Sequence, residues 1–246
     1  MLLPVHWPSM TEAGKHESWE MNVARGLVKN HTSLNISGYQ ATVASTFIPI
    51  WENAAGYVYP TNGTMLLWSS SASDVAVLIQ INGLDANYDQ ISEELLLTNG
   101  TTGVQTVKAY KRINGITVID GVNPVGTISL GNNAKTEEYA KIAIGAGTSS
   151  MSIYTVPAGH TFFLHKVNAY TNQSNNQLAN YRSYTVNASG IVRAVLQVPF
   201  VNAYISDKSI PRGYAEKTDC QWQCKSSAIS EVGLQIEGIL VKNDTP

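Results

Sequence analysis

The order of apolar and polar residues between Asp74 and Tyr110 is that of successive β-strands. Branched apolar side chains occupy every second position at its start, namely Val75, Val77, Ile79 and Ile81. A period of two indicates a strand with one more deeply buried face. Turn-forming residues at Gly83–Asp89 end this run, and an extended pattern resumes over Ile91–Thr98. Asn99-Gly100 is a strong hairpin signal before Val104–Tyr110, so the stretch predicts a β-meander.

Further strand patterns follow on either side of this meander. They cover 42–51, 57–59, 64–68, 115–120, 125–130, 139–144, 152–156, 161–167, 184–186, 191–198, 220–225 and 232–241. Short strands with turns about every ten residues are typical of sandwich domains. The polar run Gly131–Glu138 predicts a domain boundary, and an echo of Tyr57–Thr64 in Tyr154–Thr161 favours two related units. We predict an all-β protein with two jelly-roll-like β-sandwich domains, at residues 41–134 and 138–246.

Residues 1–40 differ from the rest of the chain and are predicted to form an extended N-terminal arm. Pro4 and Pro8 favour extended geometry in the residues before them. Thr11–Val28 is compatible with a short helix that ends at Gly26, or with an extended segment that packs on a neighbouring subunit. Both alternatives stay open because the apolar residues form no clean helical stripe. We expect residues 1 to about 35 to contact another chain.

The composition limits the possible functions. Hydrophobic residues make up 43% of the chain and charged residues 14%, with a formal net charge of −2. Neutral polar groups cost less to bury than ions, so this composition suits a protein that neighbours cover in an assembly. A stable β protein without partners would share it. The densest basic cluster, Lys108, Lys111 and Arg112, is expected to be a solvated face, and we predict no nucleic-acid partner.

Membrane and export signals are absent from the sequence. No apolar run approaches the roughly 20 residues that span a bilayer. Met1–His6 lacks both the charged start and the apolar core of a secretory signal. We therefore expect no membrane partner and synthesis in the cytoplasm.

The loop Asp85–Asp89, followed by Glu93, has oxygen ligands at alternate positions, as a calcium loop does. Gln90 stands where such a loop needs glycine, and Leu96 stands where it needs the chelating glutamate. Turns rich in Asp and Asn have the same pattern for backbone reasons. The sequence therefore predicts no metal site here.

No residue set indicates catalysis. Adjacent carboxylates at Glu93-Glu94 and at Glu137-Glu138 face opposite sides of a strand, as His160 and His165 would. The remaining histidines are His6, His16 and His31. A nucleophile elbow, a phosphate-binding glycine loop and an H-E-x-x-H motif are all missing. We predict no catalytic, cofactor-binding or metal-binding residues, no cofactor, and a protein that is not an enzyme.

The two cysteines, Cys220 and Cys224, are predicted to be free and partly buried thiols. Four residues of extended strand span roughly 13 Å, which is too far for a disulfide. Two thiols without a nearby histidine do not complete a four-ligand zinc site.

Aromatic residues are the remaining candidates for ligand contacts. Such residues on strands are mostly core or subunit interface, but they also form stacking platforms for sugars. The candidates are Trp51, Tyr57, Tyr59, Trp68, Tyr181, Tyr184 and Trp222.

An ordered set of short phrases resembles a group of virion structural proteins of tailed bacteriophages, particularly those of marine and cyanobacterial hosts. The order extends over about residues 23 to 219. The phrases are Val23–Val28, Ile50–Glu52, Ser69–Asp74, Ile81–Tyr88, Ile91–Glu93, Leu97–Thr101, Tyr110–Asn114, Tyr154–Gly159 and Glu216–Asp219. The segment Cys220–Cys224 departs from that group.

The resemblance implies a non-enzymatic, repeated structural component of a virion, with other virion proteins and copies of itself as partners. Capsid decoration, a tail protein and a fibre-attachment protein all stay open as its place in the particle. One alternative is a carbohydrate-binding module that recognises a host-surface glycan. Another is a polysaccharide-degrading enzyme, which would need two carboxylates from separate strands.

Overall fold

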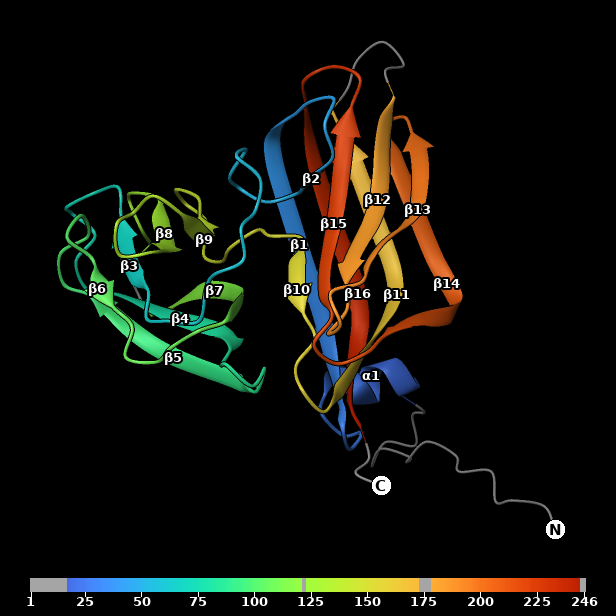
Figure 1. Ribbon diagram of the computed structural model, residues 1–246, viewed down its shortest axis with the longest axis horizontal. Coiled ribbons are helices and arrows are strands. Elements are labelled where there is room, and N and C mark those ends of the chain that lie inside the picture. Colours follow the sequence, from blue (N-terminus) through green and yellow to red (C-terminus); the bar gives the residue numbers. More distant parts are fainter. Residues whose placement is uncertain (1–16, 121–122, 173–177, 244–246) are drawn as a thin grey trace.

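The structure is a computed structural model of the 246-residue chain, and it describes residues 17–120, 123–172 and 178–243. Within these residues the protein is all-β, as predicted: its strands form four antiparallel sheets, and one short helix precedes them. Figure 1 shows the sheets as two groups that stand side by side. No helix in the described part of the chain is long and apolar enough to cross a membrane.

The larger group, here called the main sandwich, consists of two sheets packed face to face. The β1 sheet has the order β1 (His31–Val43), β16 (Ser230–Lys242), β11 (His160–Thr171) and β14 (Ala203–Tyr214). The β15 sheet has the order β10 (Ile153–Thr155), β15 (Asp219–Ser226), β12 (Ala179–Val186) and β13 (Val192–Phe200), and the short β2 (Ile48–Pro49) also pairs with β15.

Aromatic side chains fill the space between these two sheets. Alternate residues of β15 point inward, so Trp222 is 0% exposed and lies between the buried Cys220 and Cys224. The ring of Phe162, on the opposite sheet, meets the Trp222 ring edge-on at 6.2 Å and stacks on Tyr214 at 6.0 Å. Each such ring removes about 150–250 Å² of surface from water, so these contacts dominate the core.

The smaller group, here called the inserted sandwich, lies between β2 and β10 in the chain. One sheet has the order β6 (Val104–Gln105), β3 (Leu66–Ser69), β8 (Ile128–Gly131) and β9 (Glu138–Ile142). The other has the order β5 (Gln90–Leu97), β4 (Val77–Leu84) and β7 (Arg112–Asp120). Aliphatic side chains fill its core; Leu67, Ile79, Ile81 and Leu130 are all 0% exposed.

The predicted meander is confirmed for its first two strands and wrong for the third. β4 and β5 form an antiparallel hairpin, and the alternating residues of β4 point into the core. After Asn99-Gly100 the chain does not return beside β5; only Val104–Gln105 is a strand, and it pairs with β3 in the other sheet. Gly100 packs so closely under the Ser71 carbonyl that a Cβ atom there would lie 2.0 Å from it. This glycine therefore serves close packing and not a two-residue turn.

The sheets divide the chain differently from the predicted domain limits. Residues 31–40, expected in the arm, form most of β1, which pairs with β16 from the C-terminal end over His31–Gln40. Gly131–Glu138, expected to be a domain boundary, is the turn between β8 and β9. The Asn132 side-chain oxygen accepts hydrogen bonds from the backbone N–H groups of Thr136 and Glu137. A polar turn held by an Asn side chain has the composition of a linker, which explains the difference.

The strand, turn and strand predicted for both segments of the echo are present in only one of them. Tyr154–Thr161 is strand, turn and strand, whereas Tyr57–Thr64 contains no strand pairing beyond the isolated bridge at Gly63.

The hairpin predicted to turn at residues 187–190 is confirmed, because β12 pairs with β13 and the Asn187 side-chain oxygen accepts hydrogen bonds from the N–H groups of Ser189 and Ile191.

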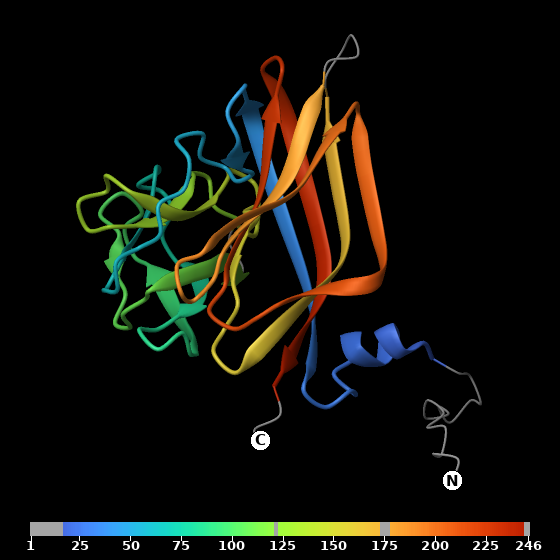
Figure 2. The same cartoon turned by 45° about the vertical axis from the view of Figure 1, so that its right-hand side comes forward.

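The described part of the N-terminal region contains a helix, α1 (Trp19–Ala24). Ser18 caps it by accepting from the Met21 N–H, and Gly26, with φ of 72°, ends it as the helical alternative predicted. The predicted extended arm is therefore wrong for Trp19–Ala24. The helix lies beside β1 at the lower end of the main sandwich, where the Trp19 ring meets His31 edge-on at 5.7 Å (Figure 2). Thr11, the predicted start, lies outside the described residues, and the contact of this region with another chain stays a prediction.

Candidate functional site

The loop Asp85–Asp89, which was considered for calcium, is held by hydrogen bonds from its own backbone to the Asp85 side chain. Asp85 Oδ1 accepts hydrogen bonds from the N–H groups of Asn87 and Asp89, at 2.8 and 2.9 Å. Glu93 lies on β5 and accepts from the N–H groups of Val107 and Lys108. The carboxylates thus bind separate parts of the backbone. Among the described residues, no three His, Cys, Asp or Glu side chains gather closely enough to hold a metal ion.

The other candidate carboxylates and histidines also have structural contacts. Glu138 accepts from Ser129 and Asn53, whereas its neighbour Glu137 accepts from Tyr139. His160 lies 2.8 Å from the Ala158 carbonyl through Nδ1. His6 and His16 fall outside the described residues.

Both cysteines are free, as predicted, but they are fully rather than partly buried. Their side chains point into the core of the main sandwich from β15. Burial raises the pKa of each thiol, Cys220 and Cys224, well above its ordinary value because the thiolate would lose its hydration. Both therefore stay protonated and unreactive at neutral pH.

The aromatic residues considered for sugar stacking are mostly core. Trp51, Tyr181 and Trp222 are at most 1% exposed. Tyr57 meets Trp51 edge-on, and Tyr59 meets Tyr57 in the same way, so these rings form a ladder at the joint between the two sandwiches. The exposed tyrosines are different ones, Tyr39 and Tyr170, which the sequence pattern did not single out.

An ion pair fixes the joint between the two sandwiches. Arg112 of β7 donates to Asp219 of β15 through Nε and Nη2, both at 2.8 Å, and both side chains are nearly buried, 13% and 10% exposed. Thr155 Oγ1 also donates to Asp219, and the guanidinium lies 4.5 Å from the centre of the Tyr59 ring. Burial acts to lower the pKa of Arg112, but the hydrogen bonds and charge of Asp219 outweigh it and raise the pKa. The prediction of a solvated face is therefore wrong for Arg112.

A polar row continues this joint along the outer face of β15. Gln221 donates to Tyr59, Gln223 donates to Gln221, and Arg182 of β12 donates to Gln223. Gln221 and Gln223 are only 8% and 5% exposed. Buried amides with satisfied hydrogen bonds fix one relative orientation, since any shift leaves polar atoms unpaired.

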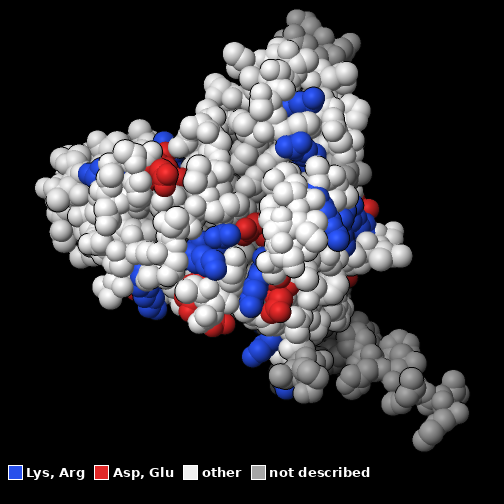
Figure 3. All heavy atoms as spheres, in the orientation of Figure 1, with Lys and Arg blue, Asp and Glu red and all other residues white. Residues whose placement is uncertain are grey.

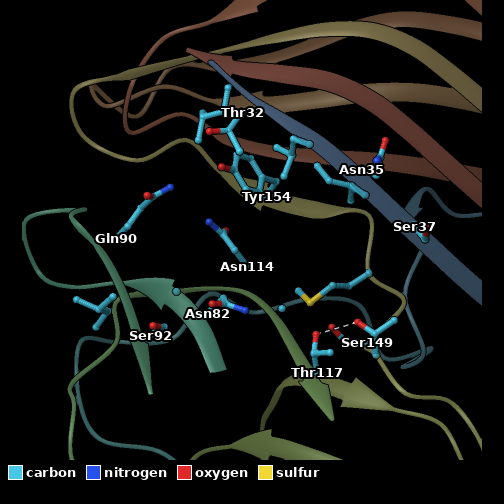
Figure 4. A pocket seen from close by; sticks show the side chains of 18 residues that line it. Thr32, Asn35, Ser37, Asn82, Gln90, Ser92, Asn114, Thr117, Ser149 and Tyr154 are labelled. Carbon is cyan, nitrogen blue, oxygen red and sulfur yellow. Dashed lines mark hydrogen bonds between the residues drawn. The ribbon is translucent and has the colours of Figure 1, made fainter. Parts of the chain in front are cut away.

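Beside this joint lies a cleft of about 470 Å³ between β1 of the main sandwich and the β5–β4–β7 sheet of the inserted one (Figure 4). Its walls are lined by Thr32, Leu34, Asn35, Ile36, Ser37, Asn82, Gly83, Gln90, Ile91, Ser92, Asn114, Gly115, Thr117, Thr148, Ser149, Met151, Tyr154 and Leu240. None of these described lining residues is Asp, Glu, Lys, Arg or His. The cleft is therefore polar without being charged.

A β-bulge aims one side chain into this cleft. Along the β4–β7 pair, Asn82 lies opposite Gly115 and Gly83 opposite Ile113, so Asn114 is the extra residue. Gly115 has φ of 152°, which a glycine adopts without strain. The Asn114 amide accepts from the Thr155 N–H at 2.9 Å and donates to the Thr155 carbonyl at 3.1 Å. Asn114 thus joins the two walls and still has one N–H free of these contacts.

Other polar side chains converge on the same space. Gln90 and Asn114 extend from the wall of the inserted sandwich (Figure 4). Thr32 and Tyr154 approach from the main sandwich. The sequence offered one signal for this site: a glycine inside a strand pattern, Asn114-Gly115, indicates a bulge. The sequence offered no signal that β1 would lie opposite β5 and β7 across a cleft.

No protein-family model matches the chain, and no curated protein matches it. Among solved structures, a chain of the T13 viral particle of infectious bursal disease virus is similar at 9% identity and a TM-score of 0.22, over 88% of this chain and 75% of that one. The VP2 subviral particle of the same virus gives 8% identity and a TM-score of 0.18, over 89% of this chain and 78% of that one. Both TM-scores are too low to establish a shared fold.

Proposed function

We propose that this chain is a structural subunit of a virion, which acts through contacts with copies of itself and with other virion proteins. The strand order of the main sandwich carries the proposal. If its eight strands other than the two-residue β2 are numbered along the chain, the sheets have the orders 1-8-3-6 and 2-7-4-5. This is the order of a jelly roll, a fold used by viral capsid and lectin domains.

Four of the exposed apolar residues lie together at one side of the main sandwich, as a subunit contact requires. β13 and β14 are the edge strands of the two sheets, on the side of the main sandwich away from the inserted one (Figure 1). This β13–β14 edge and the turn before it expose Ile191, Val192, Ile205 and Ile210, the last at 86%. Unpaired strand edges with apolar side chains favour association with another chain.

The surface charge supports the same proposal. Figure 3 shows Lys, Arg, Asp and Glu scattered over a face that is otherwise uncharged. Burying neutral polar surface against a neighbour costs less than burying ions. The carboxylates considered for catalysis, Glu93, Glu137 and Glu138, accept hydrogen bonds from nearby backbone and side-chain groups. This favours a protein that is not an enzyme.

The narrower proposal, a structural protein of a tailed bacteriophage, comes from the ordered phrases between residues 23 and 219. Its support is that resemblance alone. Within it, capsid decoration and a tail or fibre-attachment protein are both compatible with a jelly roll that carries a second sandwich at one side.

Sedimentation of the purified full chain tests the proposal. We expect defined oligomers, and we expect I205K with I210K to shift them to monomers while the circular dichroism spectrum is unchanged. The matched control is I144K with I229K, because these isoleucines are equally exposed, at 66% and 75%, but lie away from the β13–β14 edge. A wild-type chain that stays monomeric at all concentrations, or oligomers that both double variants leave intact, would contradict it.

A further inference from the structure

The walls of the cleft are held in one position by contacts between the two sandwiches. The Arg112–Asp219 ion pair joins β7 to β15, and the Asn114 amide makes two hydrogen bonds to Thr155 of β10. Both connect the inserted sandwich with the main one. A ligand therefore meets a preformed site, and its binding does not have to order the walls.

The size of the cleft suits a small molecule. Its volume of about 470 Å³ lies within the range of roughly 300–1,000 Å³ that is typical of ligand pockets. Such pockets also form preferentially where domains meet. A disaccharide or trisaccharide fits this space, whereas a folded partner does not.

The hydrogen-bonding groups select the kind of ligand. Gln90 is an exposed amide in the cleft, and Asn114 keeps one N–H for a ligand. An amide offers both donors and acceptors, and a sugar hydroxyl does the same. Thr32, Ser92 and Tyr154 add hydroxyl groups from both walls.

The lack of charged side chains among the described lining residues, and the presence of apolar ones, limit the class of ligand further. No described lining residue is cationic, so a phosphate or an acidic sugar would find no counter-ion, and its desolvation would be uncompensated. Leu34, Ile91 and Met151 supply apolar patches among the polar groups. A pyranose presents hydroxyls at its rim and C–H groups on its faces, which matches this mixture.

We propose that the cleft between β1 and the β5–β4–β7 sheet binds a neutral oligosaccharide of two or three rings. Gln90 and Thr32 provide the main hydrogen bonds, and Asn114, aimed by its β-bulge, fixes the orientation of one ring. This site does not depend on the virion role: a monomeric chain would contain the same cleft.

Chemical-shift mapping with the isotope-labelled full chain tests the site. The probes are neutral di- and trisaccharides of glucose, galactose, mannose and N-acetylglucosamine, together with sialyllactose as an acidic probe. We expect at least one neutral probe to shift the side-chain amide signals of Gln90 and Asn114, and sialyllactose to bind more weakly than lactose. Shifts confined to Tyr39 and Tyr170, tighter binding of the acidic probe, or no shift with any probe would overturn the proposal.

Two variants and a matched control assign the binding to the cleft. Q90A removes an exposed amide that makes no other described hydrogen bond, and we expect affinity to fall about tenfold, the effect of one lost hydrogen bond. T32W fills the mouth and should abolish binding. Q197A, also at an exposed glutamine but on the edge strand β13 away from the cleft, should bind as the wild type does. Equal losses in Q90A and Q197A would contradict a cleft site, as would saccharide binding by T32W.

A short peptide is the competing occupant, because β1 pairs only with β16 among the described strands and has a free edge at the cleft. A synthetic peptide of residues 1–16 is therefore included as a probe. If it shifted the cleft signals while no saccharide did, the carbohydrate proposal would be overturned.

Discussion

Two surfaces of the main sandwich reverse the usual distribution of polar and apolar residues. The outer face of β15 is polar, yet it is buried. Asp219 and Gln221 bind Arg112 and Tyr59 of the chain's own inserted sandwich, and Gln223 binds Arg182 of β12. The β13–β14 edge, in contrast, exposes the apolar side chains of Ile205 and Ile210 among polar and charged neighbours such as Asp207. The comparison indicates two kinds of contact. Polar hydrogen bonds set a fixed angle within the subunit, and we propose that the exposed apolar side chains form contacts between subunits.

The largest effect is expected from breaking the ion pair of the joint. R112A leaves Asp219 buried without its cation, which should lower the free energy of unfolding by about 3–5 kcal/mol. Urea unfolding followed by tryptophan fluorescence measures this. The control is K166A: Lys166 and Glu237 are 3.9 Å apart, and both are more than a third exposed. That change should cost about 0–1 kcal/mol, and equal losses in the two variants would contradict the assigned role of Arg112.

The next effect concerns the polar row on β15. Q223A removes the acceptor of the Arg182 Nε–H and the donor to Gln221. Leaving these buried groups unpaired should cost about 1–3 kcal/mol, measured by thermal unfolding. Q235A, at an exposed position of β16, should change stability by less than about 0.5 kcal/mol. If Q223A left the stability unchanged, water would be replacing the hydrogen bonds of Gln223 without cost.

A third prediction uses pH. Glu52 lies at the start of the connection to the inserted sandwich, and burial raises its pKa to about 7, although the Ala143 N–H and Lys141 act against this. Because the folded pKa is above the unfolded one, ionisation opposes folding. The penalty is absent below about pH 4.5, grows between there and pH 7, and is complete above pH 7.

We therefore expect E52Q to raise the melting temperature at pH 8 and to leave it unchanged at pH 4. The gain at pH 8 should be roughly 1 kcal/mol, because solvent screens this half-exposed group. Thermal unfolding of E52Q and E231Q across this pH range provides the comparison, since Glu231 is exposed. A gain that does not depend on pH would show that packing, not ionisation, is responsible.

The smallest effect on stability is expected at the β13–β14 edge. I205K places a charge on an exposed edge strand, so the free energy of unfolding should change by less than about 0.5 kcal/mol. The same variant is expected to weaken association. If I205K unfolded the monomer instead, Ile205 would belong to the core and the comparison of the two surfaces would fail.

Local patterns predicted strands whose apolar residues form a clear run, both in the middle of sheets and at the edges β5 and β13. The alternation at Val77, Ile79 and Ile81 placed β4, and Val232–Val241 placed most of β16. β14 was missed because an edge strand tolerates the Pro211 and the charges at Asp207 and Lys208 that a central strand excludes.

Long-range pairing could not be predicted from the same patterns. β1 pairs with β16 from the other end of the chain, and this pairing turns two consecutive domains into one sandwich with a second inserted in it. Arg112 and Asp219 are 107 positions apart, and nothing near either residue indicates its partner. The cleft has the same origin, because its two walls come together only when the insertion docks on β15.

Electron cryomicroscopy of the assembled form of the full chain, at side-chain resolution, tests the virion role most directly. The account predicts repeated copies related by symmetry, with Ile205 and Ile210 of the β13–β14 edge buried against a neighbouring subunit. Copies with that edge facing solvent, or a preparation that contains only separate monomers, would contradict it.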